Sequence, residues 1–340
     1  MNNHPSKNEF FDALYSDNES RIFNKRDRYL DERQWDVNQS LLEEECKIQS
    51  KFKSKNNSFT NLFIVGAPRS GTTLLSQILY NQLNIGALYN ALAKYYLVPL
   101  VGLQEIQNII SKSKAKDFES TLGNTKGQFE PHEFGYFWQY WFNPTNSHEL
   151  TEEELRNVSW SELNDKLKSY NFIQQKSLIV KSIVYTNFQI LPIYQHIQNT
   201  RFIHIQRNPE FVIQSVFEAR KKQYGDLNNW WSIKPRVWKD WTSLSPIQQI
   251  ANQVIYTEAQ IEKQLKQIPA ELVMQLKFED LLDSPEQIIS RISEKFGLKQ
   301  LSSLKSNALK NTNKFRLNST QQTEIKEAIL KAKETFIQLT

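Results

Sequence analysis

Residues 61–79 read NLFIVGAPRSGTTLLSQIL, and this stretch decides the fold. The apolar run from Leu62 to Val65 is typical of a buried strand, and a helical pattern of apolar residues begins at Leu74. The loop between them runs from Gly66 to Thr73. The first N–H groups of a helix have no partner within it, and its dipole is positive at that end. The stretch therefore predicts a phosphate-binding turn between a strand and a helix.

The spacing of the two glycines, Gly66-x4-Gly71, is that of a Walker A loop, but the next residue is Thr72 where a Walker loop has lysine. A nucleoside triphosphatase needs that lysine on the β- and γ-phosphates. Here the only cation of the loop is Arg69, two residues before the second glycine. The loop therefore argues against a nucleoside triphosphatase.

A second motif is RFIHIQRNPEFVIQSVFEAR at 201–220. Residues 202–205 predict another buried strand, which Arg207 closes. Asn208 is suited to cap the following helix, with Pro209 at its first position. Ser215 lies about two turns into that helix, and it faces Arg207 if the turn is tight. An arginine fork and a hydroxyl are both good ligands for phosphate oxygens.

A third segment, LKFEDLLDSPEQIISRISEKFGL at 276–298, predicts a strand and then a helix. Asp283 or Ser284 would cap this helix, Pro285 would begin it and Gly297 would end it. Together with the first two motifs, this segment makes the chain resemble the sulfotransferases that use 3′-phosphoadenosine 5′-phosphosulfate (PAPS). The resemblance rests on all three segments in this order and covers roughly residues 60–298.

The resemblance implies an α/β fold with a P-loop-like, doubly wound and mainly parallel sheet flanked by helices. It also implies a PAPS site without a metal. The residues expected to contact the phosphosulfate are Arg69, Ser70, Gly71, Thr72 and Thr73, with Arg69 also stabilising charge on the bridging oxygen. Arg207 and Ser215 are expected to hold the 3′-phosphate.

The general base is expected in GQFEPHEFGYFWQYWF at 127–142, where bacterial members of the family have a similar segment. Its candidates are Glu130, His132 and Glu133, and the alternative is a loop whose carboxylates only cap a helix. His204 lies within a predicted strand and is interpreted as a core histidine. Lys181 ends another strand, where a contact with substrate or PAPS and a plain salt bridge both stay open.

Two groups of aromatic residues, at 129–142 and 230–241, could line an acceptor pocket, although most of these rings are expected in the core. Lys314 and Arg316, in the polar segment 311–320, are candidates for a late loop that closes the nucleotide site. The polar residues that usually precede a helix would explain these two side chains equally well.

Strands that alternate with helices predict the doubly wound sheet independently of the family. KSLIVKSIVY at 176–185 and a run near 272–278 predict further strands, with a crossover helix at 186–199. The pattern divides the chain into an N-terminal helical arm, 1–57, and an α/β domain, 58–340. A final amphipathic helix is expected at 319–338.

The chain has 340 residues and a formal charge of +5, from 42 basic and 37 acidic residues, without a dense basic tract. A nucleic-acid partner is therefore not expected. No apolar run is long enough for a membrane span, the N-terminus has no apolar signal core, and Cys46 is the only cysteine. These features predict a cytoplasmic protein.

The predicted function is metal-independent transfer of a sulfuryl group from PAPS to a hydroxyl of a carbohydrate, lipid or other small molecule. A P-loop nucleotide kinase or NTPase is one alternative, and a non-catalytic nucleotide-binding protein is another. The acceptor and the oligomeric state stay open.

Overall fold

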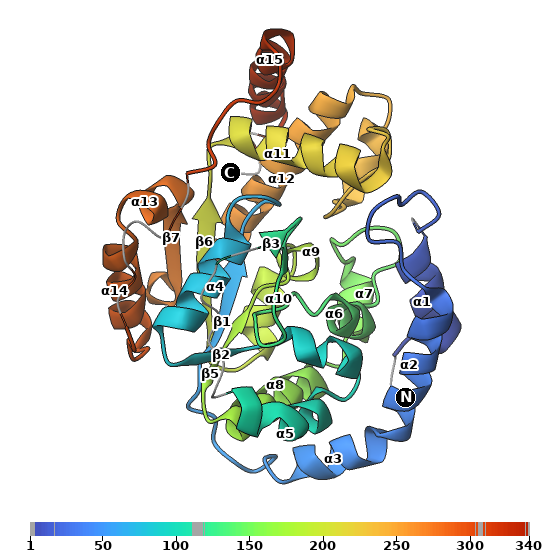
Figure 1. The fold of residues 1–340 in the computed structure, drawn as a ribbon, viewed down its shortest axis with the longest axis vertical. Helices are drawn as coiled ribbons and strands as arrows, with labels where there is room; N and C mark the ends of the chain where they lie inside the picture. Colours follow the sequence, from blue (N-terminus) through green and yellow to red (C-terminus); the bar gives the residue numbers. More distant parts are fainter. Residues whose placement is uncertain are drawn as a thin grey trace.

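The computed structural model describes residues 4–16, 18–110, 118, 120–302, 304, 309, 311–336 and 338. A sheet of five parallel strands in the order β2-β5-β1-β6-β7 forms its centre (Figure 1). The strands are β1 Asn61–Val65, β2 Ile85–Ala87, β5 Ser177–Val180, β6 Thr200–Gln206 and β7 Val273–Lys277. A separate antiparallel hairpin consists of β3 Ser120–Thr121 and β4 Asn124–Thr125.

Helices surround this sheet. The α-helices before β5 are α1 Lys7–Tyr15, α2 Arg28–Ser40, α3 Leu42–Ser50, α4 Thr72–Gln82, α5 Pro99–Ile110, α6 Gly135–Phe142, α7 Glu152–Asn157 and α8 Trp160–Gln174. Those after it are α9 Ile183–Thr186, α10 Ile190–His196, α11 Pro209–Tyr224, α12 Pro246–Leu265, α13 Phe278–Asp283, α14 Pro285–Phe296 and α15 Ser319–Phe336. The 3-10 helices are η1 Asn90–Tyr95, η2 Arg236–Trp241 and η3 Ala270–Leu272.

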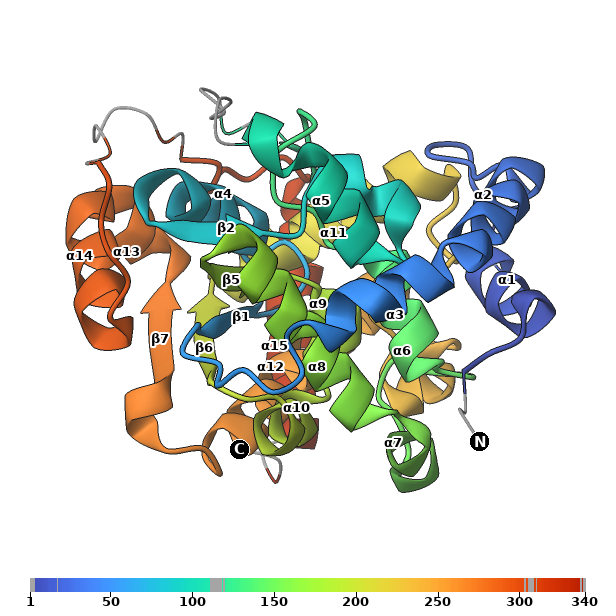
Figure 2. The ribbon, with the colours of Figure 1, turned by 90° about the horizontal axis from the view of Figure 1, so that it is seen from below.

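Strand β1 is the middle of the sheet and is buried along its whole length. Phe63 is in register with Val180 of β5 on one side and with Phe202 of β6 on the other. Helix α4 covers one face of the sheet, while α8, α10 and α12 cover the other (Figure 2). Parallel strands covered on both faces read as continuous apolar runs, as β1 does. The predicted mainly parallel α/β sheet is confirmed.

The strand expected at 176–185 is shorter than predicted, because β5 ends at Val180 and α9 begins at Ile183. The N–H of Thr186 donates to the carbonyl of Ser182, which closes a helical turn directly after the strand. The chain therefore leaves the sheet at Lys181. An apolar, β-branched run such as Ile183–Val184 cannot be distinguished from a strand by its composition.

The helix starts and the helix end predicted in the second and third motifs are confirmed, although Ser284 makes no side-chain capping hydrogen bond. Asn208 caps α11 by accepting a hydrogen bond from the N–H of Glu210, and Pro209 is the first helical residue. Helix α14 begins at Pro285 after Ser284 and ends at Gly297, whose φ of 64° is left-handed. Glycine adopts this conformation without the steric cost that a Cβ brings.

The N-terminal helices α1, α2 and α3 run along one side of the α/β unit (Figure 1). Phe10, Phe11, Trp35 and Ile48 of these helices are buried in the same apolar cluster as the residues of β1. Among the described residues, no helix is both long and apolar enough to cross a membrane.

Gly71 offers a test of how tightly the loop after β1 is packed. Its φ is 106°, and a Cβ at this position would lie 2.4 Å from Cδ2 of the buried Phe278 ring. Gly71→Ala should lower the free energy of unfolding by about 3 kcal/mol, because backbone strain and overpacking add. Denaturant unfolding measures this difference.

Gly297→Ala is the matched control. Gly297 is also left-handed, but no atom lies within 4 Å of a Cβ placed there. This variant should lose only about 1 kcal/mol, the cost of the strained backbone. Equal losses in the two variants would show that the contact with Phe278 has no energetic weight.

Candidate active site

The loop after β1 leads into a helix whose first turn is not capped by a side chain. Gly71 occupies the N-cap position of α4 in a left-handed conformation, and no side chain accepts a hydrogen bond there. Gly71, Thr72 and Thr73 line a large cavity. The N-terminal N–H groups and the positive end of the α4 dipole therefore lie at this cavity, where they can bind an anion.

Ser70 differs from its neighbours in the loop. Its side chain is fully buried, and its N–H donates to the carbonyl of Ala67 at 3.1 Å. Ser70 does not line the cavity, so this arrangement suits a residue that holds the turn.

Buried polar groups hold the start of the loop from behind. The side chain of Asn187 accepts from the N–H of Gly66 at 3.3 Å and donates to its carbonyl at 2.8 Å. Glu258 accepts from the N–H of Ala67 at 2.8 Å, and its second oxygen lies 2.7 Å from Nε2 of the buried His204. His204 is thus a core residue, as expected, and it supports the loop through Glu258.

The structure brings three predicted donor-site residues together. Arg69 Nε donates to Ser215 Oγ at 3.0 Å, and Arg207 Nη1 donates to the carbonyl of Arg69 at 3.0 Å. The Arg207 guanidinium also donates to Asn313 Oδ1 at 2.8 Å and lies 4.7 Å from the centroid of the Phe278 ring. Ser215 therefore contacts Arg69, where the sequence predicted only that it faces Arg207.

Both arginines carry positive charge in a poorly solvated place. Burial, and then the neighbouring Arg69, lower the pKa of Arg207 to about 10, and burial lowers the pKa of Arg69. Within the described part of the chain, neither guanidinium forms an ion pair with a carboxylate. Two close cations without a counter-ion favour the binding of an anion.

The three candidate bases occupy different environments. Glu130 is 2% exposed, and its Oε2 accepts from Gln77 Nε2 at 2.9 Å. Burial raises the pKa of this carboxyl, and Glu130 does not line the cavity. His132 and Glu133 both line the cavity.

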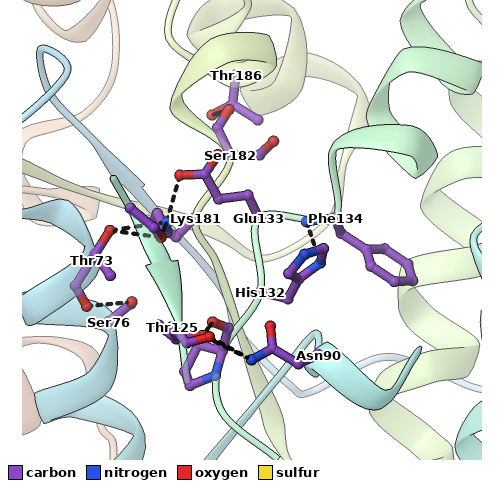
Figure 3. Close-up of polar contacts among 12 residues, drawn as sticks. Thr73, Ser76, Asn90, Thr125, His132, Glu133, Phe134, Lys181, Ser182 and Thr186 are labelled. Carbon is purple, nitrogen blue, oxygen red and sulfur yellow. Dashed lines mark hydrogen bonds and ion pairs between the residues drawn. The ribbon is translucent and has the colours of Figure 1, made fainter. Parts of the chain in front are cut away.

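His132 and Glu133 each accept a hydrogen bond, but from different kinds of donor (Figure 3). His132 Nδ1 accepts from the N–H of Phe134 at 3.0 Å, and burial lowers the pKa of the ring to about 4. Glu133 Oε1 lies 2.6 Å from Lys181 Nζ in an ion pair. Glu133 is therefore a carboxylate with a fixed cation beside it.

Lys181 is the residue whose role the sequence left undecided. Its side chain is 1% exposed, and its ammonium also donates to Thr73 Oγ1 at 3.1 Å and to the carbonyl of Gly123 at 3.3 Å. It thus joins the loop after β1 to Glu133 (Figure 3). The sequence feature that could have placed Lys181 at the site was its position directly after a buried strand, because parallel strands all end at the same edge of the sheet.

The cavity has a volume of about 1390 Å³. It extends from the loop after β1, past His132 and Glu133, to the N-terminal arm and the segment after α11. Single small-ligand sites usually measure about 300–1,000 Å³. The volume therefore leaves room for two ligands side by side.

Some of the predicted aromatic residues line this cavity, namely Tyr136, Trp230 and Trp231. Most of the others are core residues, among them Phe137 and Trp138. The prediction for Lys314 and Arg316 is untested. Neither lines the cavity, and Arg316 forms an ion pair with Glu218 at 2.6 Å.

Comparison with known proteins identifies the family. A model of the sulfotransferase family matches residues 61–302. Sulfotransferase STF9 from Mycobacterium avium shares the fold with a TM-score of 0.55 at 14% identity, covering 91% of this chain and 85% of that one. Sulfotransferase STF1 from Mycobacterium tuberculosis H37Rv gives a TM-score of 0.53 at 12% identity, covering 96% and 90%.

No match was found among curated proteins. The two structural likenesses, at 14% and 12% identity, concern the fold, whereas the family model matches the part of the sequence that forms the loop, the base candidates and the two arginines. The chain belongs to the sulfotransferase family.

Proposed function

We propose that the protein transfers a sulfuryl group from PAPS to a hydroxyl of a small-molecule or glycan acceptor. The observation that carries this proposal is the pair of half-buried arginines, Arg69 and Arg207, which have no carboxylate partner among the described residues and lie beside the uncapped N-terminus of α4. PAPS has two separate anionic groups, a 3′-phosphate and a 5′-phosphosulfate. The cationic pair and the helix end provide one anion-binding place for each.

The residues fit this donor in two parts. Arg207 and Ser215 would hold the 3′-phosphate, and Arg69 would share it, because its guanidinium already contacts Ser215. Gly71, Thr72 and Thr73 line the cavity at the start of α4 and would donate hydrogen bonds to the phosphosulfate. When bound, PAPS supplies the sulfuryl group and leaves as 3′,5′-ADP.

Glu133 is the best placed general base. Its Oε1 is held by Lys181, while its Oε2 accepts no hydrogen bond from another described residue. Oε2 would take the proton of the acceptor hydroxyl as the new S–O bond forms and the bond to the 5′-phosphate breaks. Lys181 would fix the carboxylate and keep positive charge next to Thr73, where charge develops on the leaving oxygen.

His132 is less suited to this role. Since its Nδ1 accepts a hydrogen bond from the N–H of Phe134, the neutral ring carries its proton on Nε2. This tautomer has no free nitrogen to take a proton. We therefore assign His132 as a hydrogen-bond donor in the cavity, and Glu130 as a buried partner of Gln77.

The donor assignment predicts a selective loss in Arg207→Ala. This variant should bind 3′,5′-ADP about 10- to 100-fold more weakly, because a charge-assisted contact with the 3′-phosphate is removed. Binding of 5′-AMP, which has no 3′-phosphate, should change by less than about threefold. Thermal shift and calorimetric titration of the two nucleotides measure this difference.

Arg201→Ala is the matched control, because Arg201 belongs to β6, the strand that Arg207 follows, but does not line the cavity. It should bind both nucleotides like the wild type. Equal losses for the two nucleotides in Arg207→Ala would remove the 3′-phosphate assignment. A thermal shift of the wild type only with ATP and Mg²⁺ would favour the kinase alternative.

The base assignment predicts that Glu133→Gln lowers kcat by about 10²- to 10³-fold, because proton transfer in the transition state is lost. Affinity for 3′,5′-ADP should stay within about twofold, since Glu133 is not assigned to the nucleotide. His132→Asn should lower kcat by less than about tenfold. Transfer from PAPS to an acceptor found by screening provides the rates, and a larger loss in His132→Asn would reverse the two roles.

The lowered pKa of His132 also predicts a pH effect on stability. The pKa of its ring falls from the ordinary 6.5 to about 4, so between these values the unfolded chain binds more protons than the folded one. The contribution of His132 to the free energy of unfolding is therefore fully present above about pH 6.5 and is lost as the pH falls. From pH 7 to pH 5 the wild type should lose about 2 kcal/mol more than His132→Asn in denaturant unfolding. Equal losses would show that the ring is accessible to protons.

A further inference from the structure

The part of the cavity away from the loop after β1 is built partly by the N-terminal arm. Backbone N–H groups of Ile22 and Phe23 donate to the carbonyl of Gln223 at 2.9 and 3.2 Å. The Gln223 side chain donates to the carbonyl of Phe23, and the ammonium of Lys222 lies 4.7 Å from the Phe23 ring centroid. The segment between α1 and α2 thus contacts the end of α11 and forms one wall of the cavity.

Several charged side chains line the rest of the cavity wall. Outside the loop, the base region and Arg207, the charged residues described along the cavity wall are Asp12, Arg21, Arg26, Lys126 and Lys234. The carboxylate of Asp12 already lies 3.0 Å from the guanidinium of Arg28. A cationic side chain on this wall can attract an anion.

Arg26 is the most firmly positioned of these cations. The buried side chain of Asn18 accepts from the N–H of Arg26 at 2.8 Å and donates to its carbonyl at 3.1 Å. The Arg26 guanidinium donates through Nη1 to the carbonyl of Leu14 and lies 5.7 Å from the centroid of the Tyr136 ring. A clamped backbone and a ring contact reduce the entropy that a long side chain loses when it binds a ligand.

The carboxylates near Arg26 are used by other donors. Asp31 Oδ2 accepts from the hydroxyls of Tyr15 and Tyr136, both at 2.6 Å. No ion pair joins Arg26 to a carboxylate within the described residues, and no hydrogen bond uses its Nε or Nη2 there. Arg26 therefore offers donors, and a charge with no ion-pair partner among the described residues, to whatever occupies this part of the cavity.

We propose that Arg26 is a specificity-determining residue that binds an anionic group of the acceptor. This inference rests on the proposed function, which places the acceptor beside the donor in the same cavity. The acceptor class is a hydroxyl compound that already carries a carboxylate, sulfate or phosphate. The rings of Tyr136, Trp230 and Trp231 along the same wall suit the face of a sugar.

The test compares two sugars that differ by one charge, 4-nitrophenyl β-glucuronide and 4-nitrophenyl β-glucoside. Each is titrated into the full-length protein saturated with 3′,5′-ADP, and the tryptophan fluorescence is followed, because Trp230 and Trp231 line the cavity. The wild type should bind the glucuronide about tenfold more tightly than the glucoside. Arg26→Gln should remove this preference and leave the affinity for the glucoside unchanged.

Two further variants control the result. Arg33→Gln removes another arginine of the arm, which also lies 5.7 Å from a tyrosine ring but is exposed and does not line the cavity, so the preference should persist. Arg26→Lys keeps the charge and should keep most of the preference. Equal affinities of the wild type for the two sugars, no binding of either, or a preference that survives Arg26→Gln would each overturn the inference.

The affinity for 3′,5′-ADP separates this inference from the function on which it rests. Arg26→Gln should bind 3′,5′-ADP like the wild type, which also shows that the variant is folded. If the wild type does not bind 3′,5′-ADP, the proposed function itself fails. If it binds the nucleotide but does not prefer the glucuronide, only the role of Arg26 fails.

Discussion

The site depends on the parallel pairing of β1 with β5 and β6 in the middle of the sheet. This pairing places the carboxyl ends of neighbouring strands side by side, and the chain leaves each of them at a residue of the proposed site. The loop with Arg69 follows β1, Lys181 follows β5 and Arg207 follows β6. Because the strands are buried on both faces, a shift of register would expose apolar residues, so these positions are strongly constrained.

The arrangement of charge distinguishes the binding site from its support. Behind the loop, the polar groups of Asn187, Glu258 and His204 are buried, and hydrogen bonds connect them to each other or to the loop. At the cavity, Arg69 and Arg207 lie close together without a carboxylate partner among the described residues. Two close, poorly solvated cations destabilise a folded protein unless an anion joins them, so a bound anion should contribute to stability as well as to function.

The N-terminal helices have two roles that depend on the same contacts. Their apolar residues complete the main core, so the arm is held against the α/β unit. That packing carries the segment between α1 and α2 to Gln223, where it closes one side of the cavity. The part of the chain that precedes the family match thus contributes Arg26 to the wall at which we place the acceptor.

Short-range pattern was enough to predict the turn after β1, the capping of α11 by Asn208 and the end of α14 at Gly297, because each of these depends on residues close together in the chain. The strand at 176–185 was predicted too long, since apolar composition does not show where a chain leaves a sheet. Other features depend on segments far apart in sequence: Glu133 meets Lys181 across 48 residues, and Arg69 meets Ser215 across 146. Those meetings and the place of Arg26 in the cavity wall were decided only by the tertiary structure, because strand order and helix packing determine which side chains share a space.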